Sequence, residues 1–105
     1  MTPLRISGEA LEDLNEGFLF YEAQAEGLGD YFTSCLRADI EALKVTAGIH
    51  RVVFEDVHRA LSRVFPYGVF YTCDPPGAVV WAVVDLRRDP LWIHQRLMRE
   101  KAPSS

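Results

Sequence analysis

The spacing of apolar residues changes once along the chain, and this change constrains the fold more than any other feature. Between residues 8 and 47 apolar side chains recur every three or four positions, for example at Leu36, Ile40 and Leu43. Such spacing is typical of amphipathic helices. After Gly48 the apolar residues are mostly β-branched or aromatic, and some alternate with polar residues, which favours strands. The chain therefore encodes helices first and a sheet second.

The helical half divides into two predicted helices, over residues 8–25 and 30–47. Ser7 is a suitable N-cap for the first helix. The connection at residues 26–29 contains two glycines and is short, so the helices should form an antiparallel hairpin. Gly48 is a natural end for the second helix.

Strands are predicted at residues 4–6 and within residues 51–85. The segment Asp74–Gly77 reads Asp-Pro-Pro-Gly, a strong turn signal that should join two antiparallel strands. Pro90 should begin a short terminal helix. The predicted order is β-α-α-β-β-β, an α+β fold with the helix hairpin packed on one face of a mainly antiparallel sheet.

The whole chain, residues 1–105, is expected to form a single domain, with residues 100–105 as a frayed tail. The helical and strand patterns also predict which large side chains form the core. They are Phe18, Phe32, Leu36, Ile40, Leu43, Val69 and Val83.

Composition excludes several classes of protein. The longest uninterrupted apolar run, residues 78–84, is too short to cross a bilayer, so we expect a soluble cytoplasmic protein without membrane contacts. Three histidines and the two cysteines, Cys35 and Cys73, do not stand at metal-ligand spacings, so neither a metal nor another cofactor is expected. Both thiols are expected to be buried or half-buried rather than catalytic.

The charge is unevenly distributed. The net charge of −4 argues against a protein that coats nucleic acid, so direct nucleic-acid binding should be weak or absent. Residues 1–50 carry nine acidic and three basic side chains, whereas residues 51–105 carry six acidic and eight basic ones. Nine of the eleven basic residues are arginines, which suit protein and nucleic-acid interfaces better than lysines do.

Arginines supply the candidate binding site. Arg59 and Arg63 lie four residues apart on one predicted strand and should share a face. Arg87 and Arg88 follow the last predicted strand. We expect Arg59, Arg63 and Arg87 to converge on the sheet face away from the hairpin, where they can hold a phosphodiester or an acidic peptide. The alternative is a solvated face on which these arginines pair with neighbouring acidic residues.

Five segments, taken in order, resemble the RelE/ParE superfamily of bacterial toxins, and the ParE branch most closely. They are residues 6–14 (ISGEALEDL), 20–22 (FYE), 27–32 (GLGDYF), 58–71 (HRALSRVFPYGVFY) and 87–92 (RRDPLW). The resemblance implies the β-α-α-β-β-β fold and the toxin role in a type II toxin–antitoxin pair of the plasmid-stabilisation type. It also implies neutralisation by a cognate antitoxin. ParE-like members poison DNA gyrase, whereas RelE-like members cut messenger RNA on the ribosome.

Departures from the RelE branch weigh against a nuclease. No lysine lies between Lys44 and Lys101, and no tyrosine follows Tyr71. RNA cleavage would need Arg59, Arg63 and Arg87 to supply positive charge, and His58 or His94 to move the proton.

We therefore expect a ParE-like toxin that acts by protein contact, with Arg59, Arg63, Arg87, Arg88 and Trp92 binding its target or partner. An mRNA endonuclease, and a non-toxic binding protein on the same fold, are the alternatives.

Overall fold

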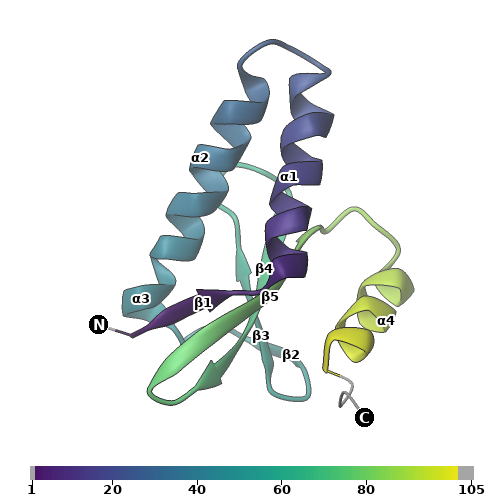
Figure 1. Cartoon of the computed structure of the whole chain (residues 1–105). Coiled ribbons are helices and arrows are strands. Elements are labelled where there is room, and N and C mark those ends of the chain that lie inside the picture. The colour runs from purple at the N-terminus through teal and green to yellow at the C-terminus, as the bar shows by residue number, and fades with distance from the viewer. Residues whose placement is uncertain (1, 102–105) are drawn as a thin grey trace.

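The computed structural model describes residues 2–101 and shows a five-stranded sheet with helices on both faces (Figure 1). The elements in chain order are β1 (Leu4–Ile6), α1 (Gly8–Glu22), α2 (Leu28–Glu41), α3 (Leu43–Thr46), β2 (Val52–Phe54), β3 (Val57–Leu61), β4 (Tyr67–Asp74), β5 (Gly77–Asp85) and α4 (Pro90–Lys101). The predicted α+β class and element order are confirmed, with one additional strand.

The helix hairpin forms as predicted, but its helices are shorter. The Ser7 hydroxyl caps α1 by accepting the N–H of Ala10 at 3.1 Å. Helix α1 ends at Glu22 rather than at residue 25, and the Glu22 carboxylate accepts the backbone N–H groups of Gly27 and Gly29 at 2.9–3.1 Å. Gly27 has φ +87°, a conformation that glycine adopts without strain, and this lets the chain reverse. The second predicted helix is divided into α2 and the single turn α3.

The segment predicted as one strand after Gly48 forms two antiparallel strands, β2 and β3. A turn at Glu55 and Asp56 separates β2 from β3, and Glu55 has φ +47°. Strand β3 then ends at Leu61, before Arg63. The prediction that Arg59 and Arg63 share one strand is therefore wrong, because the chain turns back after Leu61, where the Ser62 N–H is donated to the carbonyl oxygen of Tyr67 at 2.9 Å.

The strand order is β1-β5-β4-β3-β2, with β1 parallel to β5 and every other pair antiparallel. The turn of Pro75 and Pro76 joins β4 to β5 as predicted. A bulge at Trp81 shifts the register, since Phe70 pairs with Ala82 and Tyr71 pairs with Val80. Beyond the bulge, odd-numbered residues of β5 face the hairpin, and even-numbered ones face the opposite side.

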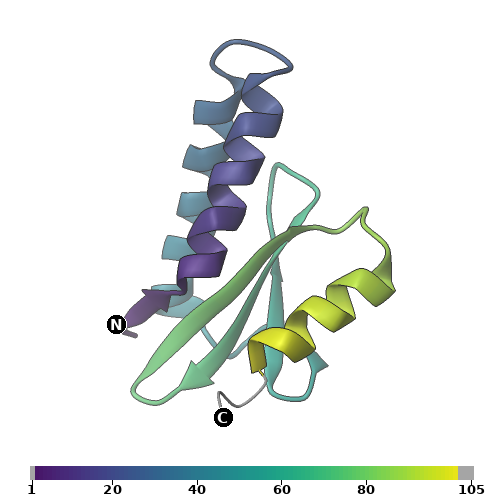
Figure 2. The ribbon, with the colours of Figure 1, turned by 45° about the vertical axis from the view of Figure 1, so that its right-hand side comes forward.

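Both faces of the sheet are covered. The hairpin closes the larger core, which is centred on Phe32, Leu36 and Tyr71. Helix α4 lies on the opposite side (Figure 2), where Leu97 packs with Phe70 and other apolar residues of the sheet. The expected open arginine face is therefore partly a second core. The predicted buried side chains are confirmed except Phe18, which is half-buried.

The C-terminal helix begins at Pro90, as predicted. The Asp89 side chain, just before it, accepts the N–H of Leu91 at 2.9 Å. It continues to Lys101, so Glu100 and Lys101 belong to the helix and not to a frayed tail. Residues 102–105 of that predicted tail lie outside the described residues. No helix within residues 2–101 is long and apolar enough to cross a membrane. The same part of the chain holds no cluster of side chains that could bind a metal ion.

Candidate partner-binding site

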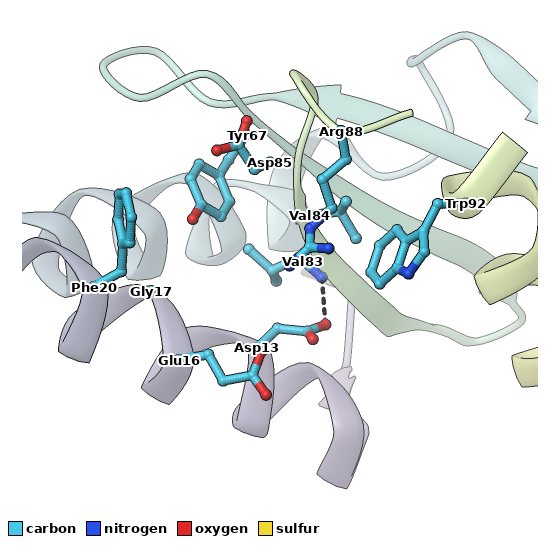
Figure 3. A pocket seen from close by; sticks show the side chains of 10 residues that line it. All are labelled: Asp13, Glu16, Gly17, Phe20, Tyr67, Val83, Val84, Asp85, Arg88 and Trp92. Carbon is cyan, nitrogen blue, oxygen red and sulfur yellow. Dashed lines mark hydrogen bonds between the residues drawn. The ribbon is translucent and has the colours of Figure 1, made fainter. Parts of the chain in front are cut away.

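A pocket of about 290 Å³ opens between α1, the end of β5 and the start of α4. Figure 3 shows Phe20 and Trp92 at opposite ends of this pocket, with Asp13 between them. The walls combine aromatic side chains with both signs of charge. The lining residues are Asp13, Glu16, Gly17, Phe20, Tyr67, Val83, Val84, Asp85, Arg88 and Trp92.

The pocket exists because β1 is short. Strand β1 pairs with β5 only along Ala78–Val80, so the outer edge of β5 has no neighbouring strand after that point. Asp13 of α1 takes the place of a strand there and accepts the backbone N–H of Val83 at 2.9 Å. The same carboxylate binds the Arg96 guanidinium of α4 at 2.8 and 3.0 Å. Asp13 thus joins the helix hairpin, the sheet and α4.

Burial on its own would lower the pKa of Arg96, but the hydrogen bonds that Arg96 donates to Asp13 and Glu100 outweigh burial, and the pKa is raised. Arg96 is only 7% exposed. Its charge therefore belongs to the internal structure and does not face a partner.

The segment between β5 and α4 presents two arginines with different surroundings. Arg87 is held by Asp85 through Nε at 3.0 Å and Nη2 at 2.7 Å. These hydrogen bonds lower the pKa of Asp85, against the opposing effect of its partial burial. Arg88 instead lies over the Trp92 ring, 4.2 Å from its centroid, and Trp92 is 37% exposed. Arg88 and Trp92 therefore form an exposed cation–π pair at the pocket mouth.

The other end of the pocket is aromatic. Phe20 is 52% exposed and packs edge-on against Tyr21, with ring centroids 5.0 Å apart. Tyr67 also lines the pocket, and burial, together with the nearby Tyr21 and Asp85, raises the pKa of Tyr67 to about 12. Tyr67 is therefore neutral at ordinary pH and unsuited to act as a base.

The predicted site residues fall into four places, three that hold arginines and a fourth that holds His58. Arg87, Arg88 and Trp92 lie together beside the pocket. Arg59 and His94 line a different cavity, under α4. Arg63 follows β3. Its side chain is 84% exposed, and its Nε lies 3.9 Å from Asp39 Oδ1. The expected convergence of Arg59, Arg63 and Arg87 is wrong, because β3 ends early and Asp85 holds Arg87.

His58 lies on the hairpin side of the sheet, away from the arginines. Its ring stacks on Tyr71 at 5.0 Å, and its Nδ1 lies 2.8 Å from the carbonyl oxygen of His50. His50 in turn lies 2.6 Å from the Tyr71 hydroxyl. Burial, and then the neighbouring His58, lower the pKa of His50. This cluster ties the segment after Gly48 to the sheet.

Sequence reasoning missed the roles of Asp13 and Arg96. Asp13 lies among the acidic residues of the outer face of α1, and no pattern separates it from its exposed neighbours. A signal existed for Arg96, which is three residues after Ile93 and next to Leu97, both of which pack on the sheet. The two cysteines are free. Cys35 is half-buried, as predicted, but Cys73 near the end of β4 is exposed, so the prediction for that thiol is wrong.

The fold is similar to a chain of a solved structure described as the chromosomal ParDE TA system from P. aeruginosa. The TM-score is 0.73 at 12% sequence identity, and the match covers 81% of this chain and 96% of that chain. No protein-family model and no curated protein matches this sequence. The similarity is therefore one of fold, and it agrees with the fold that the sequence resemblance implies.

Proposed function

We propose that this protein is the toxin of a type II toxin–antitoxin pair, that it is ParE-like, and that a cognate antitoxin neutralises it. The similarity of fold to a chain of a ParDE toxin–antitoxin structure carries this proposal. Toxicity would arise by contact with a protein target, for which DNA gyrase is the candidate that the ParE resemblance implies.

The pocket between α1 and α4 supports action by protein contact. Arg88 and Trp92 are exposed there, and arginine and tryptophan are the side chains that most often dominate the binding energy of interfaces. Phe20 adds exposed apolar surface at the other end. Of the three predicted contact residues beside the pocket, Arg87 is paired with Asp85, so Arg88 and Trp92 can bind a partner without breaking that ion pair.

An mRNA endonuclease is the second candidate, and one observation favours it. Arg59 and His94 line the same cavity, so a cation and a group able to move a proton lie close together. The other residues proposed for cleavage lie elsewhere: His58 is on the hairpin side, and Arg63 is beyond β3. This distribution favours protein contact over catalysis.

The deciding experiment expresses the chain alone, and then together with any short open reading frame found next to its gene. We expect growth arrest alone, relief on co-expression, and a complex that co-purifies. The purified protein should inhibit gyrase supercoiling and leave messenger RNA intact in a translation extract. Cleavage of messenger RNA would instead support the nuclease, and a stable complex without growth arrest would support a non-toxic binding protein.

Variants then test the surface. Arg88→Ala and Trp92→Ala should relieve growth arrest while the protein stays folded and abundant. Arg63→Ala is the matched control, because it removes an arginine that is 84% exposed and lies outside the pocket. Equal relief by Arg63→Ala would contradict the assignment of the surface.

A further inference from the structure

A second cavity, of about 280 Å³, lies between α4 and the sheet. Its walls are apolar apart from two side chains, Arg59 of β3 and His94 of α4. The apolar residues are Val53, Phe54, Phe70, Leu86, Pro90, Ile93 and Leu97. A concave apolar space with a few polar groups is the usual form of a small-molecule site.

Arg59 reaches this cavity across the sheet surface. Its side chain runs over Gly68, where an added Cβ would lie 3.2 Å from the Arg59 Cγ. The side-chain stem is therefore held against the strand. No carboxylate among the described residues forms an ion pair with Arg59, in contrast to Arg87 and Arg96.

The Nε–H group of Arg59 is buried and has no hydrogen-bond partner among the described residues. A buried donor left without a partner destabilises the folded state, and more so when the group carries charge. Such an unsatisfied donor on a cationic side chain, beside an apolar cavity, is the feature that a bound anion would complete.

His94 supplies the second polar group. Its ring meets Phe54 edge-on, with centroids 4.7 Å apart, which holds the imidazole at the cavity wall. The cavity therefore offers one guanidinium, one imidazole and apolar walls from both the sheet and α4.

We propose that this cavity binds a small monocarboxylate with an apolar body. The carboxylate would pair with the planar fork of Arg59, and the body would lie among Phe70, Ile93 and Leu97. The planar pair of carboxylate oxygens matches a guanidinium. A single arginine suits a monoanion better than a phosphate dianion, because a second buried negative charge would have no cation of its own. The volume lies just below the roughly 300–1,000 Å³ of most drug-sized sites, so the ligand is small.

This proposal does not depend on toxicity by protein contact, because the cavity under α4 and the pocket between α1 and α4 have no lining residue in common. The test uses phenylacetate as the probe and phenylacetamide as its neutral counterpart of similar shape. Each is titrated into the labelled protein and followed by backbone and arginine side-chain N–H resonances. Phenylacetate should shift the signals of Arg59, Phe70 and Leu97 with an affinity about tenfold above that of the amide.

Three variants identify the source of the preference. Arg59→Gln should remove the preference for phenylacetate over phenylacetamide, so that acid and amide bind alike. Arg59→Lys keeps the charge and stem without the fork and should retain part of it. Arg63→Gln, at an exposed arginine outside the cavity, should bind as the unaltered protein does.

Several results would overturn the proposal. They are equal binding of acid and amide to the unaltered protein, no shift from phenylacetate at millimolar concentration, or shifts confined to residues away from α4 and β3. Tighter binding of inorganic phosphate than of phenylacetate would overturn the ligand class. The spectrum of each variant also reports whether the variant is folded. If Arg59→Gln does not fold, Arg59→Lys is used to measure how far the binding of acid over amide depends on the guanidinium.

Discussion

Arg96 of α4 and Asp13 of α1 form a two-pronged ion pair, with Nη1 3.0 Å from Oδ1 and Nη2 2.8 Å from Oδ2. The two residues are 83 positions apart in the chain and nearly buried, at 7% and 11% side-chain exposure. Asp13 also accepts the N–H of Val83 at the open edge of β5. One carboxylate therefore connects the hairpin, the sheet and the C-terminal helix.

Replacing Asp13 should strongly destabilise the protein. Asp13→Ala leaves the Arg96 charge and the Val83 N–H without this partner, and breaking a buried ion pair in this way costs about 3–5 kcal/mol. Urea unfolding measures the change. Glu12→Ala is the control, since Glu12 is the exposed neighbour and its loss should change stability by less than about 0.5 kcal/mol.

The double variant separates a lost attraction from an orphaned charge. Asp13→Ala combined with Arg96→Leu removes both charges of the pair but leaves Glu100, the other partner of Arg96, so the double variant should be less destabilised than the sum of the two single variants. A double variant as unstable as the sum of the two single ones would contradict this interpretation of the pair.

Gly17→Ala should destabilise the hairpin. A Cβ at Gly17 would lie 2.4 Å from two ring carbons of Phe32, a fully buried side chain, so the core would have to move. Overpacking of this kind costs about 1–3 kcal/mol. Gly8→Ala, in the same helix, meets no atom within 4 Å and should leave stability equal or slightly higher. Thermal unfolding of the two variants makes the comparison, and equal melting temperatures would refute it.

His50 should make stability depend on pH. The Tyr71 hydroxyl accepts the Gly48 N–H at 2.9 Å and lies 2.6 Å from His50 Nδ1, an arrangement that suits a neutral imidazole. Burial lowers the pKa of His50 from its ordinary value of 6.5, so the unfolded chain binds the proton more readily. This contribution is complete above pH 6.5 and is lost as the pH falls from 6.5 towards the lower pKa of the folded state.

His50→Gln keeps an acceptor for Tyr71 without a titrating group. Its free energy of unfolding, measured between about pH 8 and about pH 5, should decline less than that of the unaltered protein. Identical slopes for the two proteins would show that His50 is not the group responsible.

Arg88 and Trp92 should matter more for binding than for folding. An exposed cation–π pair contributes about 0.5–1 kcal/mol, so Arg88→Ala should change stability by no more than that. Trp92→Ala removes a partly exposed ring and should reduce affinity for the partner further. Calorimetry with the co-purified partner measures affinity, and urea unfolding measures stability. Large losses of stability with unchanged affinity would place both residues in the fold alone.

The helical half of the fold could be predicted because its information is local. The three- and four-residue spacing of Phe32, Leu36 and Ile40 marks the buried side of α2, and a side-chain cap at Ser7 begins α1. The Asp-Pro-Pro-Gly turn likewise predicts the pairing of β4 with β5. In each case a few residues close together in the chain carry the signal, and no contact with a distant element is needed to predict the element.

The site depended on contacts that no local pattern carries. The sequence by itself determined that Arg88 lies in the link after the last strand and that Trp92 lies in the helix that Pro90 begins. Only the tertiary structure decided that Asp13 reaches the open edge of β5 and that Arg96 is buried against it. It also decided that Arg59 lies under α4 while Arg63 lies in solvent. The reason is physical: spacing along a chain specifies which face of its own element a side chain occupies, whereas burial and charge pairing depend on which distant element covers that face.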